Sequence, residues 1–130
     1  MKIACGTDII EISRVEKSIN NAGERFINEI FTKAEIDYCE SRGKAKYQHY
    51  AARFAAKEAA YKSLPIEGAS WHDAEIIKEP NGKPVMKLHG KLAEAAQKMN
   101  VDDKDISVSL SHDASFAIAT VVIVNGEEIE

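Results

Sequence analysis

The stretch from Lys46 to Leu64 is rich in alanine and contains neither glycine nor proline. Alanine is the strongest helix former, whereas glycine and proline are the weakest, so this composition predicts one long helix. Pro65 follows at once and sets the expected end of the helix, because proline disfavours a helical conformation in the residue before it. A chain of 130 residues is long enough for one well-buried core, whereas two cores would each be marginal. We therefore expect residues 1–130 to form a single domain.

The segments before and after this helix carry strand patterns. The residues from Ile106 to Leu110 alternate between apolar and polar, which is typical of a half-buried strand, and the β-branched run after Phe116 predicts a central strand. Asn81-Gly82 between two apolar runs predicts a hairpin. The expected strands are Lys2–Ile10, Ala74–Glu79, Val85–His89, Ile106–Leu110 and Phe116–Val124. They predict an α+β domain with a mainly antiparallel sheet, packed by one long helix and shorter helices.

Two capping-box patterns predict where shorter helices begin. Ser13 is followed three residues later by Glu16, and this pair can bond the first free amide groups of a helix. Thr32 and Glu35 repeat the pattern before a helix that we expect to end near Arg42-Gly43. The other expected shorter helices are residues 13–20, 24–30 and 91–99.

Composition excludes several classes of protein. Hydrophobic residues make up 45% and charged residues 29% of the chain, which is typical of a folded globular protein. The run Phe116–Val124 has half the length needed to span a bilayer, and Asp8 and Glu11 interrupt any secretion signal. Cys5 and Cys39 match no metal-ligand spacing and are too few for a disulfide scaffold. We expect them to be reduced thiols of a cytoplasmic protein, with no membrane partner.

The net charge of −4, from 17 basic and 21 acidic residues, hides an asymmetry. Residues 42–62 contain six basic residues and one acid, Glu58, and so carry +5; the remainder therefore carries −9. A local basic block in an acidic chain indicates a site for a compact polyanion. The alternative is a solvated basic helix face, and charge alone does not separate the two interpretations.

Within this block, Glu58 and Lys62 lie four residues apart and share one helix face with Phe54. A second acid, Asp8, lies where the first strand has passed Gly6. Mg²⁺ prefers one or two carboxylates, with phosphate oxygens and water filling the remaining positions, so these residues would suit a diphosphate-bound metal. The alternatives are a surface ion pair between Glu58 and Lys62 and an aspartate that only ends a strand.

Four segments resemble the signatures of the 4′-phosphopantetheinyl transferases. Gly6 to Arg14 resembles their Gly-x-Asp-(five residues)-Arg signature, and Phe54 to Lys62 matches Phe-x-x-Lys-Glu-Ala-x-x-Lys at each defined position. Pro80 to Pro84 resembles the Pro-x-Gly-x-Pro turn of the short members, and Ser109 to His112 matches their Ser-x-Ser-His ending. The segments follow the family's order and span nearly the whole chain, so the resemblance also implies that family's fold.

The resemblance implies transfer of 4′-phosphopantetheine from coenzyme A to a serine of apo-acyl carrier protein, with release of adenosine 3′,5′-bisphosphate. By similarity, Asp8 and Glu58 hold Mg²⁺ on the coenzyme A diphosphate, and Lys62 reaches the same phosphates. The serine's proton goes either to Glu58 or to a water on the metal, and the sequence does not choose between them. The residues expected at the nucleotide end are Arg53, Gly82, Lys83, Pro84 and His112.

The resemblance also implies two protein partners. Arg14 and the short helix that it opens resemble the surface that meets acyl carrier protein, although Glu16 and Lys17 give this helix mixed charge. Acyl carrier proteins are acidic, so a mixed surface is expected to dock them less strongly than a uniformly basic one. Short family members are homotrimers with interfacial active sites, in which one chain gives Asp8 and Glu58 and its neighbour some coenzyme A contacts.

Other functions remain open at this point. One is a non-catalytic nucleotide- or coenzyme-binding module, and another is transfer to a carrier domain of a polyketide or peptide synthase. An RNA-binding protein is disfavoured because acids predominate outside the basic block and no aromatic residues are interleaved with it, so no nucleic acid partner is expected. The spacing turns His49 away from Glu58, and we interpret this histidine as a plain helix residue.

Overall fold

The computed structural model describes residues 2–64 and 66–125. Its strands are β1 (Lys2–Glu11), β2 (Ala74–Lys78), β3 (Pro84–Leu88), β4 (Ile106–His112) and β5 (Phe116–Asn125). Its helices are α1 (Ile12–Ala22), α2 (Glu24–Ile30), α3 (Lys33–Glu40), α4 (Lys46–Ser63) and α5 (Gly90–Lys98), with 3₁₀ turns η1 (Gly43–Ala45), η2 (Trp71–Asp73) and η3 (Asp103–Asp105).

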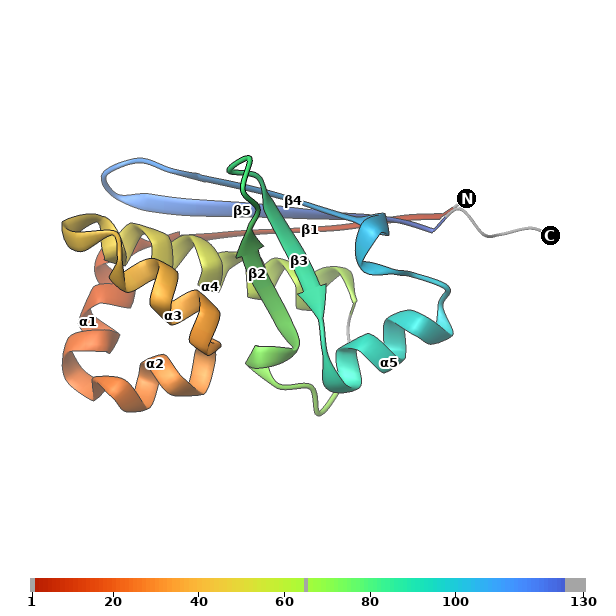
Figure 1. The fold of residues 1–130 in the computed structure, drawn as a ribbon, viewed down its shortest axis with the longest axis horizontal. Helices are drawn as coiled ribbons and strands as arrows, with labels where there is room; N and C mark the ends of the chain where they lie inside the picture. The colour runs from red at the N-terminus through yellow and green to blue at the C-terminus, as the bar shows by residue number, and fades with distance from the viewer. Residues whose placement is uncertain (1, 65, 126–130) are drawn as a thin grey trace.

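The strands form two antiparallel sheets, and each of them contains strands predicted from the sequence. One sheet has the order β1-β5-β4, so the β-branched run at β5 is central, as predicted; the other is the β2-β3 hairpin. The α+β class and the antiparallel pairing are thus confirmed. The helices lie on one side of the three-stranded sheet (Figure 1).

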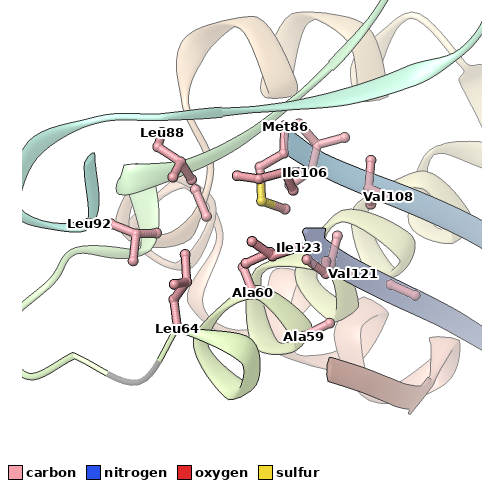
Figure 2. Packing of buried hydrophobic residues seen from close by; sticks show 14 of the residues in the cluster. Ala59, Ala60, Leu64, Met86, Leu88, Leu92, Ile106, Val108, Val121 and Ile123 are labelled. Carbon is pink, nitrogen blue, oxygen red and sulfur yellow. The ribbon is translucent and has the colours of Figure 1, made fainter. Parts of the chain in front are cut away.

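The long helix α4 packs on the inner face of β1 and β5 and divides the core into two clusters. In one of them, Leu64, Met86, Leu92 and Val121 point into a common space with residues of α4 (Figure 2). Gly6 allows β1 to approach α4 closely, because a Cβ atom there would lie 2.2 Å from the carbonyl oxygen of Ala59. Any larger residue at this position would push the strand away from the helix.

Helix boundaries depart from the predictions at two places. The expected capping box of Ser13 and Glu16 does not form, because α1 already begins at Ile12 with Glu11 as its N-cap residue and no side-chain cap. The amide of Ile12 donates to the carbonyl of Ser115 at 2.9 Å, and burial of Ile12 fixes the start of the helix one residue before Ser13. The Thr32 capping box is confirmed. The helix that Thr32 caps ends at Glu40, before the expected Arg42-Gly43, and Pro65 lies outside the described residues.

On the outer face of the three-stranded sheet, β1 and β5 carry apolar side chains that remain exposed within the described structure. Ile3 and Ile9 on β1 are 68% and 60% exposed, and they lie opposite Val124 and Ile118 on β5, which are also exposed. Over residues 2–64 and 66–125, none of the helices combines the length and apolar character needed to cross a membrane.

Candidate active site

Asp8 and Lys62 meet where β1 crosses α4. The Nζ of Lys62 donates to Asp8 Oδ1 at 3.2 Å and to the carbonyl oxygen of Thr7 at 2.9 Å. The close approach at Gly6 makes this contact possible, since Gly6 lies against Ala59 one turn earlier on the helix. In the Gly-x-Asp segment, the glycine thus permits the close approach of β1 to α4, and the aspartate makes the contact with Lys62.

Glu58 lies one helical turn before Lys62 and shares a cavity of about 460 Å³ with Asp8. The pKa of Glu58 is raised, first by partial burial and second by the negative charge of Asp8, while Lys62 opposes the shift. A carboxylate pair whose charges act on one another is an arrangement that a bound cation would stabilise. The structure thus brings Asp8 together with Glu58 and Lys62, which are distant from it in sequence.

Apolar and charged side chains line this cavity together. Phe26, Phe54 and Phe116 line it together with the two carboxylates. Arg14, the residue predicted to meet acyl carrier protein, is exposed on α1 and lines the same cavity. A cavity of this composition can hold an apolar chain beside a charged reacting group.

The basic block does not form one surface, because Lys57 is fully buried. Its Nζ lies 2.8 Å from Glu35 Oε1 and donates to the carbonyl oxygens of Trp71 at 3.0 Å and Ala74 at 2.8 Å. The other oxygen of Glu35 accepts from the Ile76 amide at 2.8 Å. Burial lowers the pKa of Lys57, and the charge of Glu35 opposes this shift. The interpretation that counted Lys57 toward an anion site is corrected: this cation is already neutralised inside the core.

A second cavity, of about 240 Å³, contains most residues predicted for the nucleotide end. Arg53, Gly82, Pro84 and His112 line it. Arg53 is only 3% exposed, and its Nε has no hydrogen-bond partner among the described residues. A buried guanidinium group with an unused donor is a strong candidate for binding an anion. We refer to this cavity as the anion pocket.

Three further polar residues line the anion pocket, and the sequence did not assign them to it: Tyr38, His49 and Lys78. The His49 ring lies 5.8 Å from that of His112, and the guanidinium of Arg53 lies 4.3 Å from the centre of the Tyr38 ring. The four-residue spacing of His49 and Arg53 on α4 was a usable signal, because such residues share a helix face. For Tyr38 and Lys78 the sequence holds no comparable signal.

The cavity of Asp8 and Glu58 and the anion pocket share no lining residue among those described. Arg53 and Glu58 are five residues apart, which places them about 140° apart around a helix. Asp8 is on the edge strand β1 and His112 on the opposite edge strand β4, with β5 between them, so about two strand spacings separate them. Lys83 faces neither cavity and lines a third hollow, beside β3 and β4. Apart from Lys83, the predicted site residues thus divide into two half-sites in one chain.

The sequence profile of the 4′-phosphopantetheinyl transferase superfamily matches residues 4–121. The chain belongs to this superfamily. Holo-[acyl-carrier-protein] synthase of Ruminiclostridium cellulolyticum is 44% identical over 133 residues, covering 100% of this chain and 98% of that relative.

Solved structures of relatives share the fold of this transferase. That of Helicobacter pylori holo-[acyl-carrier-protein] synthase in complex with coenzyme A has a TM-score of 0.78 and 33% identity, covering 92% of this chain and 99% of that one. That of the Neisseria meningitidis enzyme has a TM-score of 0.83 and 29% identity, covering 94% and 98%. The chain thus matches these enzymes over nearly their full length.

Proposed function

We propose that this transferase moves 4′-phosphopantetheine from coenzyme A to a serine of apo-acyl carrier protein and releases adenosine 3′,5′-bisphosphate. The observation that carries the proposal is that Asp8 and Glu58 line one cavity while Lys62 contacts Asp8. Relatives that match nearly the whole chain are holo-[acyl-carrier-protein] synthases, and the Helicobacter pylori relative was solved with coenzyme A. We also propose that the 130 residues act as one domain, because both core clusters share α4.

The two carboxylates fit Mg²⁺. Asp8 and Glu58 supply oxygen ligands to one cavity. The pKa of Glu58 is raised first by partial burial and second by the negative charge of Asp8, and a bound cation would offset the second cause. No group of three or more potential metal-ligating side chains occurs in the described parts of the chain, so water and the diphosphate would complete the coordination. When bound there, Mg²⁺ would supply charge stabilisation to the diphosphate as it is cleaved.

The protein's own residues would then position the reactants. The carrier serine's oxygen attacks the phosphorus that bears the pantetheine arm, its proton passes to Glu58, and the bond to the adenosine bisphosphate breaks. Lys62 donates to Asp8 and is 54% exposed, so its ammonium can turn to the phosphate oxygens that gain charge. Reactions of this type require positioning and charge neutralisation and form no covalent enzyme intermediate.

The two half-sites support assembly of a homotrimer, in which one chain's Asp8 and Glu58 face its neighbour's anion pocket. The uncovered apolar face of β1 and β5, with Ile3 and Ile9, provides a surface for that assembly. We propose that Gly82, Lys83 and Pro84 of the β2-β3 turn contribute to the nucleotide end together with Arg53 and His112. Gly82 has φ +89°, which a side chain would strain.

Mixing two inactive variants tests whether the sites form between chains. Glu58→Gln chains retain an intact anion pocket, and Arg53→Met chains retain intact carboxylates. Random association of equal amounts restores about a quarter of the wild-type activity, because one in four interfaces pairs two intact halves. If each site lay within one chain, mixing would restore nothing.

Acyl carrier protein would dock beside Arg14, at the edge of the cavity that holds Glu58. An acidic partner is attracted to an exposed arginine there, and the attraction weakens as salt screens it. The serine that accepts the group would then lie next to the carboxylates.

A mass-shift assay tests the whole proposal. Apo-acyl carrier protein incubated with the protein and coenzyme A gains the mass of phosphopantetheine, and EDTA prevents the gain. The alternative, a non-catalytic coenzyme-binding module, predicts coenzyme binding with no gain of mass. If acyl carrier protein gained no mass at saturating Mg²⁺, the enzymatic function would be rejected.

A further inference from the structure

The anion pocket gathers positive groups around one aromatic ring. Tyr38 has the cations of Arg53, Arg42 and Lys78 at 4.3, 5.2 and 5.3 Å from its ring centre. The negative face of an aromatic ring stabilises such cations, but it leaves their net charge in place. Among these cations, the Nε of Arg53 has no partner in the described structure. Among the described residues, no acidic side chain lines the pocket, so the charges of Arg53 and Lys78 are not neutralised by its lining.

His49 lies inside this positive environment. Its ring packs edge-on against Tyr38 at 5.3 Å and against His112 at 5.8 Å, and both contacts are made from elements other than α4. The pKa of His49 is lowered to about 4. Burial is the largest cause, and the positive charges of Arg53, His112, Arg42 and Lys78 lower the pKa further. These charges come from α4, β4, the segment after α3 and β2, so positive groups from four segments add to burial in favouring the neutral imidazole.

A phosphate monoester bound in the pocket would offset the positive charge around His49. It carries close to two negative charges near neutral pH, and such an anion beside an imidazole favours the protonated ring. We propose that His49 takes up a proton when the monoester phosphate of coenzyme A occupies the anion pocket, so that coenzyme binding is coupled to protonation. This inference rests on the function proposed above, which places the nucleotide end of coenzyme A in this pocket.

The sign of the coupling follows from linkage. A group whose pKa is higher in the complex than in the free protein strengthens binding as pH falls below the higher value. His49 starts from a pKa of about 4, and recovery of the ordinary value of 6.5 would add about 0.7 proton per bound coenzyme at pH 6.0. It would also tighten binding about fourfold at pH 6.0 and almost not at all at pH 7.5.

Calorimetry of coenzyme A binding, in buffers of different ionisation enthalpy, measures this proton directly. We expect the wild type to take up about 0.7 proton more than His49→Phe and His49→Gln at pH 6.0, and no more at pH 7.5. Subtracting the variants removes protons exchanged by the phosphate itself. Dephospho-coenzyme A, which lacks the monoester, is the matched ligand and should abolish the difference.

Several outcomes would overturn the inference. Equal proton uptake by wild type and both variants does so while leaving the proposed function standing. An undiminished difference with dephospho-coenzyme A does so as well, because the monoester would then not be the cause. If neither variant folds, NMR of the His49 ring in the wild type provides the test. A pH titration of these resonances that is the same with and without adenosine 3′,5′-bisphosphate would reject the proposed protonation. Failure of the wild type to bind coenzyme A at all would instead reject the proposed function.

Discussion

Helix α4 carries two lysines five residues apart, and each meets a carboxylate in an opposite environment. Lys57 and Glu35 are both 0% exposed, and further polar partners surround the pair. Lys62 and Asp8 are 54% and 18% exposed, and their contact is longer, at 3.2 Å against 2.8 Å. A lysine and a carboxylate thus form a fixed ion pair within the core in one case, and an exposed pair that can exchange partners in the other.

The difference lies in what each pair can still bind. Lys57 contacts Glu35 and donates hydrogen bonds to two carbonyl groups, which ties α4 to α3, to η2 and to the start of β2. Lys62 sits in solvent beside a cavity with two carboxylates, where a surface ion pair contributes little stability. Burial therefore separates a lysine that holds the fold from a lysine that is free to meet a substrate.

The largest expected effect tests the residue between the two lysines. Glu58→Gln should lower kcat by at least about 10³-fold and leave the melting temperature unchanged, because it removes a metal ligand and proton acceptor but no core contact. The mass-shift assay in excess Mg²⁺ and thermal unfolding measure the two quantities. Near wild-type transfer would contradict the assignment of Glu58 to the catalytic group.

Lys57→Met should act mainly on stability, in contrast to Glu58→Gln, which should act on kcat. It leaves the carboxylate of Glu35 buried without its cation, which costs about 3–5 kcal/mol in free energy of unfolding. Urea denaturation measures this loss. The double variant with Glu35→Gln is the matched control and should be more stable than Lys57→Met alone, because no unpaired charge remains. A Lys57→Met protein as stable as the wild type would show that the buried pair does not hold α4.

Lys62→Met is the surface counterpart of that substitution. We expect kcat to fall by about 10²-fold while the free energy of unfolding changes by less than about 0.5 kcal/mol. Activity and urea denaturation of the same preparation test this pairing of results. A stability loss comparable to that of Lys57→Met would remove the distinction between the two lysines.

The smallest expected effect concerns a cation without a role in the chemistry. Arg14→Ala should raise KM for acyl carrier protein about threefold, leave kcat unchanged, and flatten the dependence of KM on salt. Lys17→Ala, on the same helix but outside the cavity lining, is the matched control. Equal effects of both substitutions would show that the general charge of α1, and not Arg14, guides docking.

Local patterns predicted much of the fold. The alanine-rich run became α4, the alternation after Ile106 became β4, and the Thr32 capping box formed. These features depend on residues within one or two turns of one another, for which propensity and periodicity are direct physical signals. The Ser13 capping box failed because a tertiary contact, burial of Ile12, outweighed a local preference.

The candidate site was predictable to the extent that it depends on helix periodicity. Glu58 and Lys62 share a face because they are four residues apart, and His49 and Arg53 share another for the same reason. The position of Tyr38 among three cations was not predictable, because that cluster joins α3, α4 and β2. Nor did the basic block reveal that one of its lysines is neutralised inside the core.

By itself, the order of residues determined which side chains could act together along α4, since a helix repeats every 3.6 residues whatever surrounds it. Only the tertiary structure decided that Asp8 reaches Lys62, that Glu35 neutralises Lys57, and that Arg53 opens on a separate cavity. Those three outcomes depend on how closely β1, α3 and β4 approach the helix. Such distances are set by packing between segments far apart in the chain, which no local pattern encodes.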